Sequence, residues 1–131
     1  MGRRELREHI FRLLFRTEFH SEAEMTEQED FYLAYLGEIS DEDRAYIQGK
    51  VNAIIEKKAD LDSRINSVAD KWKTERMTKV DLTIIRLASY EIIFDEEVPV
   101  GVAINEAVEL AKRYGTDQSP SFVNAVLAKL A

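Results

Sequence analysis

The sequence predicts an all-α fold of about seven helices in two packed helical subdomains. Apolar residues recur at intervals of three and four along almost the whole chain, which is the period of a helix with one buried face. Only two prolines and five glycines interrupt the 131 residues, and there are no cysteines. A chain of this length can bury a core without disulfide bonds. No apolar run of about 18 residues occurs, so no membrane contact is expected.

The first helix is expected over residues 3–18. Its apolar residues gather on one face: Leu6, Ile10, Leu13 and Leu14. An acidic connection over residues 21–25 should follow. Thr26, with Glu29 three residues later, resembles a capping box and predicts that a second helix starts there and ends at Gly37.

Two more helices are expected before a break in the pattern. Ser40, with Asp43 three residues later, predicts the start of a third helix whose helical spacing continues to Lys58. A short fourth helix is expected from Asp62 to Trp72, because the apolar residues of that stretch also recur at helical spacing.

The polar stretch over residues 73–76 is the predicted boundary between the two subdomains. It separates an N-terminal subdomain, residues 1–73, from a C-terminal subdomain, residues 74–131. The stretch contains no flexible Gly/Ser linker, so the two halves are expected to pack together as one domain.

The C-terminal subdomain is expected to form around one central helix. Thr78 with Asp81 predicts the start of a helix over residues 79–94, and a helix that is apolar nearly all round is usually buried. A turn and a sixth helix follow, and Gly115 is expected to end that helix as a left-handed cap. Ser119 is expected to be the N-cap of the seventh helix, with a proline directly after it.

The charge is distributed unevenly along the chain. The net charge is −7, which by itself argues against a protein that binds nucleic acid. Residues 1–16, however, contain five arginines and two glutamates, a net charge of +3, so the rest of the chain carries −10. The sequence therefore predicts a basic leading helix on an acidic body.

Residues that support catalysis are scarce. The two histidines, His9 and His20, lie eleven positions apart. The sequence has no Gly-rich phosphate loop, no cysteine nucleophile and no His/Asp cluster with metal-ligand spacing. We therefore expect a protein that is not an enzyme and that uses neither a cofactor nor a metal.

The first helix combines arginines with aromatic rings. Its stripe consists of Arg4, Glu8, Phe11 and Phe15, and is bordered by Arg7. Arginines beside exposed rings suit single-stranded RNA, because guanidinium groups bind phosphates while rings stack on unpaired bases. Spacing alone favours the alternative, an amphipathic helix with a solvated basic face and both phenylalanines in the core. Phe11 is the stronger core candidate, and Phe15 is the stronger candidate for facing a partner.

Two further features leave alternatives open. Phe122 lies in the first turn of the seventh helix, after a loop with amide and hydroxyl groups, where free backbone N–H groups could bind phosphate. Phe122 could equally pack in the core, with Ser119 acting only as a cap. On the fifth helix, Arg86 could pair with a carboxylate inside the protein, or the helix could present its charges to a protein partner.

The chain resembles the NusB family of bacterial transcription antitermination factors in three places. The first is the arginine-rich start, Arg3-Arg4-Glu5-Leu6-Arg7-Glu8 with Leu14-Phe15. The second is Asp81-Leu82-Thr83-Ile84-Ile85-Arg86-Leu87-Ala88-Ser89-Tyr90-Glu91-Ile92. The third is Val102-Ala103-Ile104-Asn105-Glu106-Ala107-Val108-Glu109-Leu110-Ala111-Lys112, followed by Gly115 and by Ser119-Pro120-Ser121-Phe122-Val123-Asn124.

The resemblance implies a NusB-like fold and a role in antitermination. It implies binding to the boxA segment of rRNA leader transcripts, a heterodimer with the small-subunit ribosomal protein NusE, and a link to RNA polymerase in the cytoplasm. The RNA surface that it implies consists of Arg3, Arg4, Arg7, Phe15, Gln118 and Phe122. The protein-partner surface that it implies includes Glu75, Asp81, Arg86 and Tyr90.

The chain departs from the family at three points. Glu5 stands where family members often have a basic residue, Phe15 stands where they usually have tyrosine, and no basic tail follows Ala131. These departures imply weaker RNA binding by the protein alone. Two alternatives remain: a protein-interaction module that forms homodimers, and an RNA-targeting domain related to the one that precedes certain rRNA cytosine methyltransferases.

Overall fold

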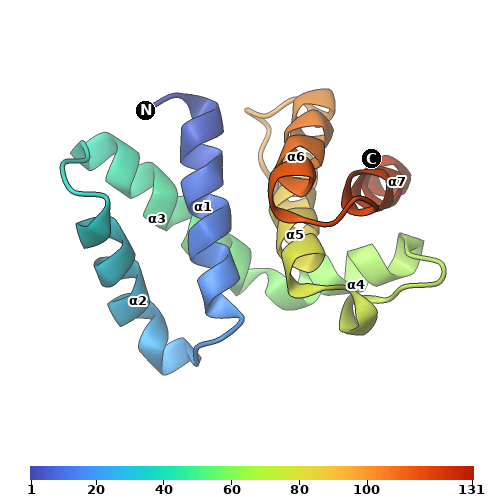
Figure 1. Ribbon diagram of the computed structural model, residues 1–131, viewed down its shortest axis with the longest axis horizontal. Helices are drawn as coiled ribbons and strands as arrows, with labels where there is room; N and C mark the ends of the chain where they lie inside the picture. Colours follow the sequence, from blue (N-terminus) through green and yellow to red (C-terminus); the bar gives the residue numbers. More distant parts are fainter. The chain divides into compact units, whose positions relative to one another are not determined.

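The computed structural model describes residues 1–131, except for the side chain of Glu22. The described backbone consists of α-helices joined by short loops, with one 3-10 turn and no strand (Figure 1). In chain order the elements are α1 (Arg3–Thr17), α2 (Glu22–Tyr35), α3 (Asp41–Glu56), α4 (Lys58–Val68), η1 (Thr74–Arg76), α5 (Lys79–Phe94), α6 (Val100–Tyr114) and α7 (Ser119–Leu130). The expected all-α class with seven helices is confirmed.

The chain divides into two compact units, Met1–Ile55 and Glu56–Ala131. The sequence-based boundary lies further along the chain, between residues 73 and 74. The difference concerns α4, which packs on α5 and α7 and therefore belongs with the second unit. Its apolar residues Leu61 and Ile65 are fully buried, so the C-terminal core includes this helix.

The first unit contains α1, α2 and nearly all of α3. The apolar face expected for the first helix is confirmed, because all four of its residues are buried: Leu6, Ile10, Leu13 and Leu14. The other two helices contribute the rest of this core, chiefly Tyr32, Leu33, Ile47, Val51 and Ile54. Within the unit, α1 packs against α2.

The second unit is arranged around α5. This helix packs on α4, α6 and α7, and every residue from Asp81 to Ser89 is buried. Thr78 caps it as expected, since its hydroxyl oxygen accepts a hydrogen bond from the Asp81 backbone N–H at 3.1 Å. The expectation of a central helix is confirmed.

The second helix starts earlier than expected. The Glu24 carboxylate accepts hydrogen bonds from the backbone N–H of Ser21 at 3.2 Å and from its hydroxyl at 2.8 Å. This reciprocal cap adds a turn before Thr26, so the acidic segment expected to be a connection is helical. The end of the helix is as expected, because Gly37 adopts φ +75, a left-handed conformation that favours glycine.

The fourth helix ends earlier than expected, at Val68 instead of Trp72. The Lys73 ammonium donates hydrogen bonds to the carbonyl oxygens of Asn66 and Ala69, which satisfies carbonyl groups that the last turn leaves unpaired. The chain turns back at this point. Trp72 lies outside the helix with 52% of its surface exposed, so its expected place on the helix's apolar face is wrong.

Glu29 is a buried carboxylate of the first unit. Its side chain is 6% exposed, and its Oε1 atom has no hydrogen-bond partner among the described residues. Burial, and secondarily the charge of Asp30, raise the pKa of this carboxyl above its ordinary value. The ionised form is therefore disfavoured in the folded protein.

We expect Glu29→Gln to raise the melting temperature at pH 7 by about 3–6 °C, which corresponds to about 1 kcal/mol for a chain of this size. Because the pKa of Glu29 is raised in the folded state, its ionisation destabilises the protein only above the ordinary carboxyl pKa. The gain in melting temperature should therefore disappear below about pH 4. Thermal unfolding followed by circular dichroism across this range measures it. Glu27→Gln on the exposed side of the same helix is the control, and an equal gain there would refute the explanation.

Candidate nucleic-acid interface

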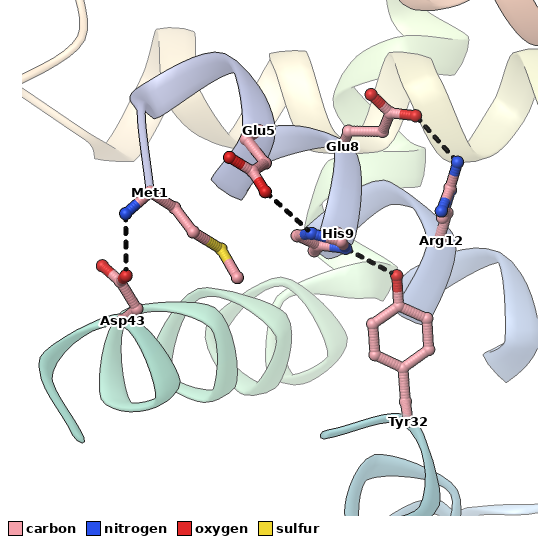
Figure 2. Close-up of polar contacts among 7 residues, drawn as sticks. All are labelled: Met1, Glu5, Glu8, His9, Arg12, Tyr32 and Asp43. Carbon is pink, nitrogen blue, oxygen red and sulfur yellow. Dashed lines mark hydrogen bonds and ion pairs between the residues drawn. The ribbon is translucent and has the colours of Figure 1, made fainter. Parts of the chain in front are cut away.

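The arginines of α1 lie in different environments. Arg3 and Arg4 are exposed in the first turn, whereas Arg7 is only 7% exposed. Arg12 donates a hydrogen bond to the Glu8 carboxylate at 2.9 Å, which lowers its availability for an external phosphate (Figure 2). Arg3 and Arg4 are exposed at the N-terminal end of the helix, where a phosphate backbone can approach them.

Polar contacts connect α1 to the rest of its unit (Figure 2). His9 Nδ1 lies 2.8 Å from the Tyr32 hydroxyl on α2, and within α1 its Nε2 lies 3.9 Å from the Glu5 carboxylate, one turn earlier. At the chain start, the Met1 amino group donates a hydrogen bond to Asp43 of α3 at 3.0 Å, and this bond raises the pKa of the amino group. These contacts fix the side of α1 that faces the unit.

Three phenylalanine rings, of Phe11, Phe15 and Phe19, follow one another from the middle of α1 to just past its end. The centroids of Phe11 and Phe15 are 6.1 Å apart, and those of Phe15 and Phe19 are 5.2 Å apart. Phe11 is 2% exposed, Phe15 is half-buried and Phe19 is 59% exposed, so the row leads from the core to the surface. Phe11 is a core residue as expected, and Phe15 lies at the edge of the core, where part of its ring is exposed. Phe19 was not a candidate on sequence grounds, although its spacing of four from Phe15 continues the stripe.

The residues expected at the start of the last helix lie on one short loop and turn. Gln118 is exposed and Phe122 is half-buried. Ser119 is 2% exposed, and its hydroxyl oxygen accepts a hydrogen bond from the Thr116 backbone N–H at 2.9 Å. The expected role of Ser119 as the N-cap is wrong, because this residue is the first of α7 and its hydroxyl instead secures the preceding loop.

Gly115 is required for a reason other than the one expected. Its φ of −94 is not left-handed, so the predicted left-handed cap is wrong. A Cβ atom at this position would lie 2.4 Å from Ser119 Oγ, 2.5 Å from Ser119 Cβ and 2.8 Å from the Ala111 carbonyl oxygen. The close approach of the loop to the start of α7 therefore demands a residue without a side chain.

The residues expected to contact a protein partner lie on η1 and α5. Arg86 forms two hydrogen bonds of 2.7 Å to the Asp62 carboxylate, so the internal pairing that the sequence left open exists. Asp81 is buried, and its Oδ1 atom has no partner among the described residues. Glu75 is exposed, and Tyr90 is half-buried with its ring centroid 5.7 Å from that of Phe94.

The candidate RNA residues divide between the units. Arg3, Arg4, Arg7 and Phe15 belong to the first unit, and Gln118 and Phe122 belong to the second. Among the described residues, no group of three or more His, Asp or Glu side chains could hold a metal ion. None of the described helices has the length and apolar character needed to cross a membrane.

Comparisons with known proteins agree over the whole chain. The model of the NusB family matches residues 4–131. The transcription antitermination protein NusB of Agathobacter rectalis is 53% identical over 131 residues, which cover 100% of both chains. The solved structure of T. maritima NusB has a TM-score of 0.87 and 32% identity, and covers 100% of this chain and 91% of that chain.

A second solved structure shows a related fold in a complex. It is a crystal structure of antitermination factors NusB and NusE with double-stranded RNA, in which the matching chain has a TM-score of 0.86. The identity is 23%, and the match covers 98% of this chain and 94% of that chain. At this identity the likeness demonstrates the fold alone.

We expect Gly115→Ala to destabilise the protein by about 1–3 kcal/mol, because the new methyl group must displace Ser119 or the Ala111 carbonyl. Gly49→Ala is the matched control. Gly49 lies in the middle of α3, and a Cβ there would meet nothing within 4 Å, so alanine should stabilise by about 0.5–1 kcal/mol. Urea unfolding of both variants measures the two effects. A neutral result at Gly115 would contradict the close approach.

Proposed function

The chain belongs to the NusB family, and from this premise we propose that it is a transcription antitermination factor that binds boxA-type single-stranded RNA together with NusE. In this role it supports processive transcription of rRNA by the RNA polymerase antitermination complex in the cytoplasm. The observation that carries the proposal is the end-to-end likeness to a curated antitermination protein at an identity of about one half. Regulation, not catalysis, is its proposed activity.

The proposed RNA surface of the first unit combines charge and rings. Arg3 and Arg4 supply two exposed guanidinium groups, which bind phosphates, and Phe15 with Phe19 supplies ring surface on which an unpaired base can stack. Arg7 is mostly buried, so its proposed contribution is to position the helix and add positive potential. The acidic remainder of the chain repels phosphate, which favours binding at this helix.

The proposed RNA surface of the second unit is the turn that starts α7. Gln118 offers an exposed amide, which can donate to a phosphate or to a base edge, and Phe122 offers part of its ring. Ser119 has a supporting role, because its hydroxyl holds the loop on which Gln118 lies. This turn is proposed to contact RNA.

The proposed surface for NusE comprises Glu75, Asp81, Arg86 and Tyr90. The exposed carboxylate of Glu75 and the half-buried ring of Tyr90 are the parts of this surface that a partner can reach. Arg86 is proposed to act mainly by holding α4 on α5 through Asp62. A second protein is needed because a chain with net charge −7 attracts RNA weakly on its own.

One observation favours a second candidate function, a module that forms homodimers. Phe31 and Tyr35 lie one turn apart on α2 and are 59% and 79% exposed. Exposed aromatic residues of this kind often mark protein interfaces. The molecular mass in solution, measured by analytical ultracentrifugation with and without NusE, distinguishes the two candidates: a stable dimer that does not dissociate when NusE is added favours the second.

We expect the protein to bind boxA-type single-stranded RNA more tightly in the presence of NusE, with an affinity that decreases as salt increases. Replacing Arg3 and Arg4 by alanine should weaken binding and reduce the slope of log K against log salt by about 0.7 for each phosphate that is no longer neutralised. Thermal stability should remain within about 0.5 kcal/mol, because both residues are exposed. Fluorescence anisotropy of labelled RNA measures the binding.

The control is Lys58→Ala, which removes an exposed positive charge outside the proposed surface. It should change affinity and salt slope much less than the arginine pair does. Absence of RNA binding at low salt, both with and without NusE, would refute the proposed function. Equal effects of Lys58 and the arginines would refute the assignment of the surface.

A further inference from the structure

We propose that the hollow between Trp72 and Phe122 is a nucleobase subsite that takes one unstacked base of a single-stranded RNA. The inference rests on the proposed function and deepens it, because it adds Trp72 and Lys71 to the RNA surface of the second unit. Neither residue was a candidate on sequence grounds.

The hollow lies within the second unit and has a volume of about 220 Å³. One wall is the end of α4 with the segment that follows it, including Lys71 and Trp72, and the other wall is α7, including Phe122 and Val126. Pockets for drug-sized ligands usually measure about 300–1,000 Å³, so this smaller volume suits a single flat ring system. Two aromatic rings at the walls give such a ring system surfaces on which to stack.

The wall that carries Trp72 is held in place by hydrogen bonds to α4. The Thr74 backbone N–H donates to Asn66 Oδ1 at 2.8 Å, and Asn66 Nδ2 donates to the Thr74 hydroxyl at 3.1 Å. Lys73 donates to two carbonyl groups at the end of the same helix. These hydrogen bonds hold the backbone on both sides of Lys73 against α4, and the indole of Trp72 lies half-exposed beside them.

The wall that carries Phe122 is fixed from the other end of α7. The close approach of Gly115 to Ser119 sets the position of the first turn, shortly before the hollow begins at Phe122. Near the far end of the helix, Lys129 donates a hydrogen bond to Asp70, which joins the two walls directly. Both walls are thus held before any ligand arrives.

The charges at the hollow favour a nucleotide over a neutral apolar group. Lys71 and Lys129 line it, and the Arg76 guanidinium lies 5.8 Å from the centroid of the Trp72 ring. Among the lining residues that the structure describes, the one carboxylate is Asp70; it is paired with Lys129, and this hydrogen bond lowers the pKa of Asp70. The local balance is positive in a chain of net charge −7, which suits the phosphates on either side of a stacked base.

The experiment uses the full-length protein and its intrinsic fluorescence. Trp72 is the only tryptophan of the chain, so indole emission reports on this hollow alone. A nucleobase stacked on indole quenches its emission. We expect titration with boxA-type single-stranded RNA, with NusE absent, to quench Trp72 emission with the same apparent Kd that anisotropy of the labelled RNA gives.

Substitutions test the same site by affinity. Trp72→Ala should weaken RNA binding by about 5- to 150-fold, the range measured when a stacking ring is removed, and Trp72→Phe should retain most of the affinity. Lys71→Ala should reduce the salt slope by about 0.7. Tyr46→Ala is the matched control, because it removes an exposed aromatic ring of α3 that no proposed surface includes, and the affinity of this variant for RNA should be unchanged.

The outcomes separate the subsite from the proposed function. RNA binding by anisotropy with unchanged Trp72 emission and an unaffected Trp72→Ala variant would overturn the subsite and leave the function intact. A change of emission on adding NusE but not on adding RNA would also overturn it, since the occupant would then be a protein. Absence of RNA binding under every condition would overturn both. Since emission is measured on the unaltered protein, the test remains decisive even if Trp72→Ala fails to fold.

Discussion

The burial of α5 on every side is the constraint on which the second unit depends. A helix without a polar face must be covered by its neighbours, so α4, α6 and α7 all pack against it. The one arginine in its buried stretch then needs a partner, and Asp62 provides it through two 2.7 Å hydrogen bonds. That pair joins α4 to α5. The position of α4 in turn sets the position of the segment that follows it, which carries Trp72.

Most of the fold could be predicted because helical periodicity and caps are local signals. Ser40 and Thr78 cap the helices that the sequence assigned to them. The differences between prediction and structure have two physical causes: two local signals competed, or the deciding contact was distant in sequence. Ser21 with Glu24 and Thr26 with Glu29 have the same spacing, and nothing local says which pair is used. The grouping of α4 with the second unit depends on packing against α7, far along the chain.

The candidate site was only partly accessible from sequence. The arginine-rich first turn and the stripe that includes Phe15 are patterns along one helix, so they could be found. Whether an arginine of that helix is exposed depends on its neighbours, which is why Arg7 differs from Arg4. The hollow beside Phe122 could not be found, because its two walls come from segments about fifty residues apart.

The unequal distribution of charge within the first unit has a kinetic consequence. The basic start of α1 shares this unit with a stretch from Thr17 to Asp43 that has no lysine or arginine. An approaching polyanion is therefore attracted by the exposed Arg3 and Arg4 and repelled by the acidic residues of the same unit, so that encounters away from the two arginines are shorter-lived. The acidic residues, which only weaken the equilibrium attraction for RNA, thereby make the search for the correct orientation more efficient.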